Sequence, residues 1–109
     1  MKLLSWNVNG VRAVSRKGML DRVLREKPDV LCLQETKASP DQLGPEIREI
    51  SGYRADWHWA ERKGYSGVGT YTRAAPASVD SGMGMPRYDC EGRVLVSRYP
   101  GFVLYNVYF

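Results

Sequence analysis

The sequence predicts a mixed α/β fold, in which a β-α-β unit opens the chain and a largely antiparallel meander follows. Two observations support this class. Between Lys2 and Gln34, two apolar runs flank an amphipathic segment, and the unbroken run Val30–Leu33 is typical of a strand buried on both faces of a parallel sheet. From Tyr53 to Phe109, short β-rich segments alternate with Gly and Pro turns.

The β-α-β unit begins with a strand expected at Lys2–Asn7 and an exit loop over Asn7–Gly10. A helix is expected at Gly18–Lys27, because its apolar residues share one side and Pro28 ends it. The second strand is expected at Val30–Gln34. A right-handed crossover makes these two strands parallel and adjacent.

The middle of the chain is expected to be rich in loops. Ser39–Asp41 has the order of an N-cap followed by Pro at the first helical position, and Gly44–Pro45 divides the following residues into short turns. The meander then comprises a strand through Trp57 and Trp59, a tight turn at Lys63–Gly64, a strand at Gly67–Thr72, a long loop at Ala74–Pro86, and a hairpin that joins Arg93–Ser97 to Phe102–Phe109 through Pro100–Gly101.

Composition limits the class of protein. The chain has 109 residues, of which 43% are hydrophobic, so it is one domain or less and not a disordered tail. No apolar run approaches the roughly 18 residues of a membrane helix, and the start of the chain becomes polar too early for a secretory signal. We therefore expect no membrane partner.

Charge and cysteine content limit the expected partners and the expected compartment. Lys plus Arg number 16 against 12 Asp plus Glu, a net charge of +4, and 11 of the cations are Arg. This balance permits nucleic-acid binding without demonstrating it. Cys32 and Cys90 have neither zinc-site spacing nor the pattern of a disulfide scaffold, which predicts a reducing, cytoplasmic environment.

The expected helices can cover only one face of the sheet. The other face needs a cover, either from a further segment of chain or from self-association. Because a β pattern continues up to Phe109, we expect residues 1–109 to be the N-terminal part of a single domain whose C-terminal half is absent.

Two polar residues are expected at one edge of the sheet. Asn7 and Glu35 each end a strand, and parallel strands end at the same edge, where open α/β sheets bind ligands. A carboxylate at the rim of a core needs compensation, and Mg²⁺ commonly takes one or two carboxylates together with waters. The alternative is that Glu35 pairs with Lys37 or is simply solvated.

Five short blocks carry a resemblance to a known family. They are Ser5–Ala13, Leu33–Lys37, Lys63–Gly69, Asp89–Arg93 and Asn106–Tyr108. In order and rough spacing they resemble the exonuclease III-type apurinic/apyrimidinic endonucleases. The first two blocks alone would indicate the wider endonuclease/exonuclease/phosphatase superfamily, which includes deoxyribonuclease I, sphingomyelinases and inositol phosphatases. The Lys-Gly-Tyr-Ser-Gly and Glu-Gly-Arg blocks narrow the resemblance to the DNA-repair branch.

The resemblance implies a four-layer α/β sandwich, of which this chain would form half. It also implies a phosphodiesterase that uses Mg²⁺, or Mn²⁺ as a substitute, and cleaves double-stranded DNA 5′ to abasic sites or trims 3′ ends. Glu35 matches the glutamate that ligates the metal, and Asn7 matches an asparagine that orients active-site carboxylates by hydrogen bonding. Asn9 falls near the metal, but its amide carries no charge, which argues against direct ligation. Lys37 is expected beside the metal ligands.

The same resemblance implies that the Tyr108 hydroxyl approaches the scissile phosphate. Tyr65, Arg12, Lys63 and Arg93 would contact the DNA backbone. For Tyr108 the alternative is a strand aromatic packed in the core. For the three cations the alternative is a solvated charge or a structural ion pair, and Gly92 with Arg93 would then only build the hairpin.

Other features limit the expected activity. His58, the only histidine, is interpreted as a half-exposed strand residue rather than a catalytic one. The family's Asn-Gly-Asp-x-Asn and Ser-Asp-His segments have no match, so residues 1–109 alone are expected to be inactive. Two alternatives stay open: a phospholipid or phosphoinositide hydrolase of the same superfamily, and a noncatalytic fragment that binds DNA or self-associates.

Overall fold

The computed structural model describes residues 1–109 and contains two β-sheets. The four-stranded sheet has the order β1-β2-β4-β3, formed by Leu3–Asn7, Val30–Gln34, Val68–Thr72 and Arg54–His58. The three-stranded sheet has the order β5-β6-β7, formed by Ser78–Ser81, Val94–Tyr99 and Phe102–Val107. The helices are α1 (Val11–Arg16), α2 (Met19–Leu24), the 3₁₀ turn η1 (Pro40–Gln42), α3 (Pro45–Arg48) and α4 (Pro86–Asp89).

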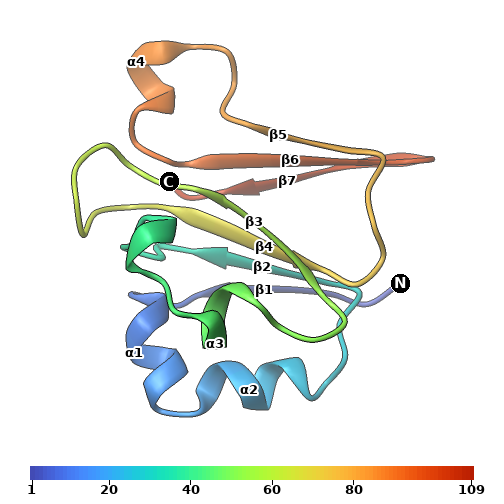
Figure 1. The fold of residues 1–109 in the computed structure, drawn as a ribbon. Coiled ribbons are helices and arrows are strands. Elements are labelled where there is room, and N and C mark those ends of the chain that lie inside the picture. The colour runs from blue at the N-terminus through green and yellow to red at the C-terminus, as the bar shows by residue number, and fades with distance from the viewer.

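The β-α-β opening and the antiparallel meander are both confirmed. β1 and β2 are parallel, and every other strand pair is antiparallel. The first four residues of β2 are buried, as its apolar run predicts. Figure 1 shows α1, α2 and α3 on one side of the four-stranded sheet and the three-stranded sheet on the other. The mixed α/β class follows from this arrangement.

The main core lies between the four-stranded sheet and its helices. Eleven buried residues form it, and α1, α2 and α3 each contribute at least one of them. Tyr71 is completely buried in this cluster and donates a hydrogen bond of 2.6 Å to the Ile47 carbonyl in α3. Trp57 meets the Tyr71 ring edge to face, with ring centroids 5.6 Å apart. The helices are therefore attached to the sheet by apolar packing and by one buried phenol.

Two predictions about the elements were wrong, and one helix was not predicted. The exit loop expected over Asn7–Gly10 is present, but α1 follows it directly, because Gly10 turns the chain with a φ of 104° and Val11 and Val14 then pack into the core. The expected helix at Gly18–Lys27 is shorter, since only Met19–Leu24 is α-helical. The loop expected at Ala74–Pro86 contains β5, whose mostly polar residues form a strand because they pair with β6.

The expectation of an uncovered sheet face was correct only in part. β7 packs across β2 and β4, and the Asn106 amide donates hydrogen bonds to the carbonyls of Leu33 and Gly69. An open groove of about 460 Å³ remains between β1 and β7, and Leu3 and Tyr105 are exposed there or beside it. The second sheet thus covers the middle of the face and leaves its β1 side open.

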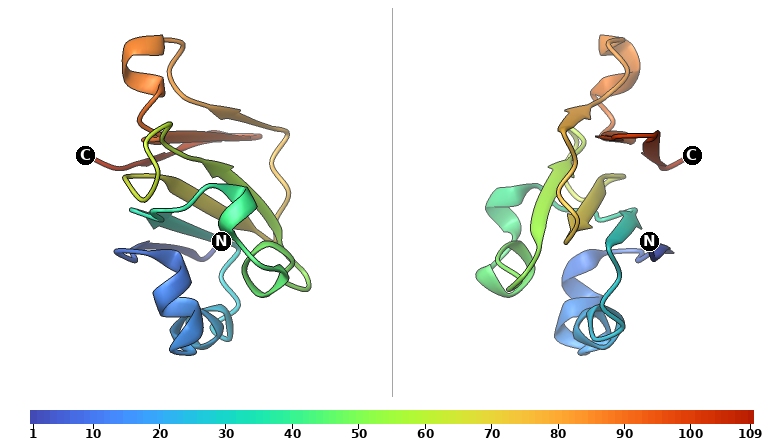
Figure 2. Two further views of the ribbon diagram at one scale, coloured as in Figure 1. Left: turned by 60° about the vertical axis from the view of Figure 1, so that its left-hand side comes forward. Right: turned by 90° about the vertical axis from the view of Figure 1, so that its right-hand side faces the viewer.

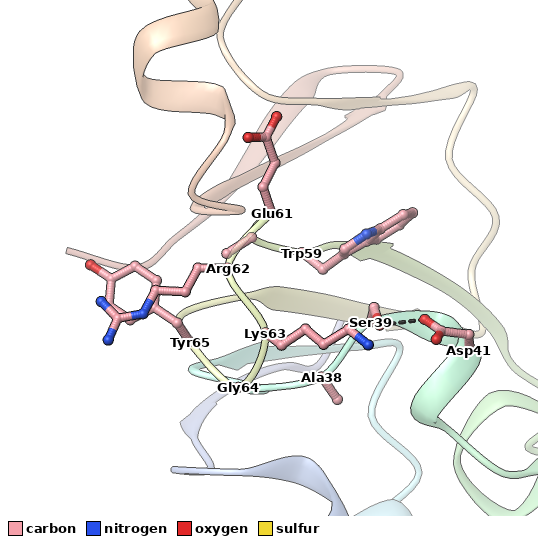
Figure 3. A pocket seen from close by; sticks show the side chains of 10 residues that line it. Ala38, Ser39, Asp41, Trp59, Glu61, Arg62, Lys63, Gly64 and Tyr65 are labelled. Atoms are coloured by element: carbon pink, nitrogen blue, oxygen red, sulfur yellow. Dashed lines mark hydrogen bonds between the residues drawn. The ribbon is translucent and has the colours of Figure 1, made fainter.

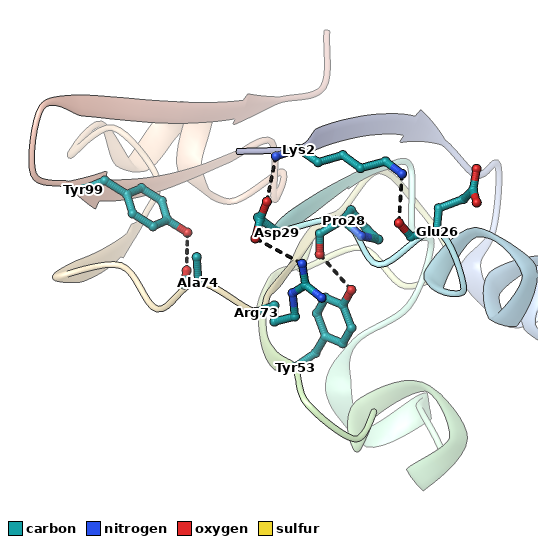
Figure 4. A network of polar contacts seen from close by, with 8 residues as sticks. All are labelled: Lys2, Glu26, Pro28, Asp29, Tyr53, Arg73, Ala74 and Tyr99. Atoms are coloured by element: carbon teal, nitrogen blue, oxygen red, sulfur yellow. Dashed lines mark hydrogen bonds and ion pairs between the residues drawn. The ribbon is translucent and has the colours of Figure 1, made fainter.

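Polar contacts fasten the sheet end opposite to Asn7. Asp29 accepts a hydrogen bond from the Lys2 backbone amide at 2.7 Å and pairs with Arg73 at 3.3 Å (Figure 4). The Tyr99 hydroxyl donates to the Ala74 carbonyl at 2.7 Å. The amide hydrogen bond from Lys2, followed by the bond from Arg73, lowers the pKa of the Asp29 carboxyl. These contacts hold β1, β4 and β6 together at their far ends.

Candidate functional site at the carboxyl edge of β1 and β2

Asn7 and Glu35 leave the sheet at the same edge, as the sequence predicts. Asn7 is the last residue of β1 and lies opposite Gln34, the last residue of β2, so Glu35 is the first residue beyond the ladder. The Val8 amide then donates to the Gln34 carbonyl at 3.0 Å, and the Gly10 amide donates to the Glu35 carbonyl at 2.8 Å. The two exit segments therefore continue side by side.

A third segment, Lys63–Gly69, closes the other flank of Glu35. The Thr36 amide donates to the Gly67 carbonyl at 3.0 Å, and the Lys37 amide donates to the Ser66 carbonyl at 2.8 Å. Gly67 has a φ of 91°, and a Cβ on it would come within 2.3 Å of the Thr36 hydroxyl oxygen, so this close approach requires glycine. Three of the five sequence blocks are thus joined around Glu35 by backbone hydrogen bonds.

The backbone at this edge is strained. Five non-glycine residues in the structure have positive φ, and three of them are Asn9 (47°), Glu35 (61°) and Lys37 (57°). A left-handed conformation costs an ordinary L-residue about 1–2 kcal/mol, and such residues cluster at functional sites. The surrounding hydrogen bonds hold the strained turns in place, which indicates that the positions of these three side chains matter.

One ammonium group joins the two oxygen-bearing side chains. The Lys37 Nζ atom lies 2.6 Å from Asn9 Oδ1 and 3.3 Å from Glu35 Oε2. The side chains of Lys37 and Glu35 are 37% and 21% exposed, so water screens this ion pair. Pairing of Glu35 with Lys37, the alternative interpretation of the sequence, is therefore present in the structure.

The donor atoms at this edge fit a hard divalent cation. Glu35 Oε2 and Asn9 Oδ1 already contact the same positive charge, and both are oxygen ligands of the kind that Mg²⁺ prefers. Only one of them is a carboxylate, so an ion held here would keep several waters. The chain has no group of three or more His, Cys, Asp and Glu side chains arranged to hold a metal.

Asn7 shapes the turn that follows β1. Its Oδ1 atom accepts the Asn9 backbone amide at 3.0 Å, the local contact by which an Asn side chain shapes a turn. Asn7 thereby orients Asn9, and the structure gives it no hydrogen bond to Glu35. Arg12 also contacts this edge, because its Nη2 atom donates to the Lys37 carbonyl at 3.2 Å. The Arg12 guanidinium thus uses one of its donors within the protein.

Tyr108, Arg93 and Tyr65 form a second cluster. The Arg93 guanidinium donates to Glu91 Oε1 at 2.8 Å, to the Tyr65 hydroxyl at 2.8 Å and to the Tyr108 carbonyl at 3.2 Å. It also lies 5.1 Å from the ring centroid of Tyr108 and 5.7 Å from that of Tyr65. The hydrogen bond to Glu91 is the main cause of a raised Arg93 pKa. These contacts favour a structural role for Arg93, and none of them joins the Tyr108 side chain to Glu35.

Gly92 explains the Glu-Gly-Arg block. Its φ is 60°, and a Cβ on it would come within 2.3 Å of the Trp59 backbone. Glu91 forms a bridge with Ala60, which brings the start of β6 against the end of β3. His58 ends β3, and its Nδ1 atom is 2.9 Å from the Val94 carbonyl. This contact is consistent with the interpretation of His58 as a strand residue.

Lys63 projects over a shallow pocket of about 190 Å³ (Figure 3). Trp59 and Tyr65 are among its lining residues, and Figure 3 shows the Lys63 amino group directed towards Ser39 and Asp41. A hydrogen bond from Ser39 is the main cause of the lowered pKa of Asp41, to which the Lys63 charge also contributes. No ion pair fixes Lys63, so its ammonium remains free to contact an anion.

Sequence reasoning missed Asn106 and Gln34. Asn106 is only 3% exposed, and its amide contacts β2 and β4. Its side chain also lies close to Gln34, which immediately precedes Glu35. One signal for Asn106 was present in the sequence: it is the polar residue in an otherwise apolar and aromatic strand. The hairpin prediction gives no reason for a polar residue there.

Comparison with known proteins identifies the family. A model of the Endonuclease/Exonuclease/phosphatase family matches residues 4–109. The chain is 40% identical over 108 residues to a DNA-(apurinic or apyrimidinic site) endonuclease of Dictyostelium discoideum, covering 99% of this chain and 30% of the relative. It is 39% identical over 109 residues to an exodeoxyribonuclease of Bacillus subtilis, covering 99% of this chain and 42% of the relative.

Solved structures agree with this relationship. The fold matches a 3′-5′ exonuclease from Neisseria meningitidis with a TM-score of 0.79 and 30% identity, covering 99% of this chain and 41% of the other. It matches an AP endonuclease from Archaeoglobus fulgidus with a TM-score of 0.77 and 29% identity, covering 99% and 40%. The chain thus spans less than half the length of these relatives. None of its helices is long and apolar enough to cross a membrane. The chain belongs to the endonuclease/exonuclease/phosphatase family, within its exonuclease III-type apurinic/apyrimidinic endonuclease branch.

Proposed function

We propose that the chain is part of a DNA-repair phosphodiesterase that needs Mg²⁺, or Mn²⁺ in its place, and acts on double-stranded DNA at abasic sites or 3′ ends. The observation that carries the proposal is the strained edge, where three sequence blocks meet and where Asn9 Oδ1 and Glu35 Oε2 both contact the Lys37 ammonium. Relatives named for abasic-site cleavage and exonuclease activity support DNA over a phospholipid as the substrate class.

The chain's own residues have distinct roles in this proposal. Glu35 would hold the ion in place of the Lys37 ammonium, the uncharged Asn9 oxygen would lie beside it, and Asn7 fixes the Asn9 turn. When bound, the ion would supply Lewis-acid stabilisation of charge on a phosphate oxygen. Tyr108 directs its hydroxyl to the scissile phosphate, and Arg93 holds Tyr108 and Tyr65 in position.

The residue that activates water is proposed to come from sequence outside residues 1–109. A test joins this chain to the part of the Bacillus subtilis relative that it does not match, and assays a duplex with one abasic site against the same duplex without it. We expect Mg²⁺-dependent cleavage beside the abasic site, loss of cleavage with Glu35→Ala, and no product from residues 1–109 alone. Undiminished cleavage by the Glu35→Ala protein would remove the proposed metal role.

DNA contacts can be tested on residues 1–109 by the salt dependence of binding. A side chain that neutralises one phosphate contributes about one unit to the slope of log K against log salt concentration. We expect Lys63→Gln to lower the slope by about one, because none of the ion pairs within the chain includes Lys63. Arg93→Gln is the matched control and is expected to lower stability while leaving the slope unchanged, since its donors are used within the protein. Equal slopes for Lys63→Gln and the unmodified chain would contradict the Lys63 assignment.

A second candidate function is a noncatalytic module that binds DNA or self-associates. The observation that favours it is the open groove beside β1, together with the exposed apolar side chains of Leu3, Tyr105 and Phe109. A concentration-dependent dimer in analytical ultracentrifugation, combined with DNA binding that is indifferent to Mg²⁺, would favour this candidate over the nuclease.

A further inference from the structure

A line of side-chain hydrogen bonds crosses the two sheets close to the proposed metal edge. Gln34 Nε2 donates to Ser5 Oγ at 3.0 Å and to Asn106 Oδ1 at 2.9 Å. Asn106 Nδ2 in turn lies 2.8 Å from the Gly69 carbonyl and 3.2 Å from Thr70 Oγ1. The line therefore joins four strands. β1 and β2 are parallel neighbours, β4 is the antiparallel neighbour of β2, and β7 belongs to the other sheet.

Asn106 is the centre of this line because it acts as donor and acceptor together. Its Oδ1 atom accepts from Gln34, while its Nδ2 atom donates to the carbonyls of Leu33 and Gly69. The side chain is 3% exposed, so a group that cannot make both kinds of bond leaves buried polar atoms without partners. A carboxylate cannot donate, and an aliphatic side chain can do neither.

The position of Asn106 in the chain gives this bonding a consequence. On the β2 side, its partner Gln34 is followed directly by the strained residue Glu35. On the β7 side, Tyr108 lies two residues further on, and its amide continues the ladder by donating to the Arg93 carbonyl at 2.9 Å. Asn106 thus stands between the end of β2 that carries the carboxylate and the end of β7 that carries the phenol.

We propose that Asn106 is a positioning residue that fixes the separation between the Glu35 edge and Tyr108. This inference rests on the proposed function, because that function gives the separation its importance. Apolar packing between the sheets comes mainly from β6, whose first four residues are buried, whereas the residues of β7 other than Asn106 are exposed or half-buried. β7 itself therefore adds little apolar packing that could fix its end against β2. The amide of Asn106 supplies instead a directional connection that fixes one strand end relative to the other.

The test compares Asn106→Leu with a matched control, Tyr99→Phe. The control removes one hydrogen bond, from the Tyr99 hydroxyl to the Ala74 carbonyl, at the opposite end of β6. The first readout needs no metal: it is hydrogen exchange of the amides of Val8 and Tyr108, which flank the edge and the phenol. In Asn106→Leu we expect these amides to exchange about tenfold faster relative to global unfolding, and in Tyr99→Phe we expect no such change.

The second readout uses Mn²⁺ as a paramagnetic probe. We expect Mn²⁺ at the Glu35 edge to broaden the amide resonance of Asn9 and, to a smaller extent, the ring resonances of Tyr108. We expect the ratio of these two effects to change in Asn106→Leu and to be unchanged in Tyr99→Phe. If Asn106→Leu does not fold, Gln34→Met is the second variant: it removes the bond between Gln34 and Asn106 and leaves the Asn106 bonds to the Leu33 carbonyl and to β4 in place.

Each outcome decides a different claim. If Mn²⁺ broadens neither resonance in the unmodified chain, the proposed function fails, and hydrogen exchange still decides the role of Asn106. If exchange and the broadening ratio change equally in Asn106→Leu and Tyr99→Phe, or in neither, Asn106 only contributes to stability and the positioning role is overturned.

Discussion

Replacing Glu35 with glycine is expected to give a more stable chain than replacing it with alanine. Both changes remove the carboxylate and its ion pair with Lys37, so the comparison between the two variants isolates the backbone. Glu35 has a φ of 61°, a left-handed conformation that alanine tolerates poorly and glycine adopts freely. The hydrogen bond from the Gly10 amide to the residue 35 carbonyl is kept in both variants.

The expected difference follows from two opposing terms. A left-handed conformation costs alanine about 1–2 kcal/mol. Glycine loses more conformational freedom on folding, which offsets about 0.4–1 kcal/mol of that advantage. The glycine variant should therefore be more stable by about 0.8 kcal/mol, the difference between the centres of the two ranges, which corresponds to a few degrees in Tm for a domain of this size.

The assay is urea unfolding of both variants, followed by circular dichroism, with the same pair of substitutions at Arg22 as the control. Arg22 is exposed within α2, where alanine is favoured over glycine by about 1 kcal/mol, so the order of stability should reverse there. An alanine variant at position 35 that equals or exceeds the glycine variant would refute the argument that the backbone at Glu35 is strained. Neither variant at position 35 is expected to bind Mg²⁺ at the edge.

Three further predictions concern other parts of the fold. Tyr71→Phe should lower the free energy of unfolding by about 1–3 kcal/mol, measured by urea denaturation, because the buried Ile47 carbonyl loses its donor; an unchanged midpoint would contradict this. Burial raises the pKa of Cys32 to about 11, so a thiol reagent at neutral pH should modify Cys90 first, and mass mapping that finds Cys32 modified in the folded chain would be inconsistent with its burial. The Asp89 carboxylate accepts hydrogen bonds from two backbone amides, which lower its pKa below the ordinary value of 3.8. The stabilising effect of the carboxylate is therefore complete above pH 3.8 and is lost as the pH falls through the lowered pKa. Asp89→Asn should destabilise the chain at neutral pH and have little effect in strong acid.

The sequence predicted the layout of the first sheet well because burial patterns are local. The apolar run Val30–Leu33 and the short β-rich segments after Tyr53 are confirmed as strands, and parallel pairing of β1 and β2 follows from the β-α-β order. It failed at α1 and β5, where propensity is weak and tertiary contacts decide. α1 forms because Val11 and Val14 reach the core, and β5 forms because β6 offers a free edge.

The same division applies to the candidate site. Chain order alone brings Asn7 and Glu35 to one sheet edge, because parallel neighbours end together. The sequence could not show that the Lys37 ammonium contacts both Glu35 and Asn9, since this contact depends on strained turns. Nor could it show that the Arg93 guanidinium donates hydrogen bonds to Glu91 and to residues distant in the chain. For Arg93 the interpretation as a DNA contact and the structural alternative were indistinguishable until its partners were known.

The sequence by itself indicated the family, through the resemblance of five short motifs. It also determined the order of the strands in the opening unit and the edge at which the polar residues gather, because these depend on the pattern of residues along the chain. Only the tertiary structure decided which side chains meet there. Asn106 shows the physical reason: its hydrogen bonds with Gln34 and Gly69 join residues on different strands and different sheets, and no local pattern encodes the packing that buries it.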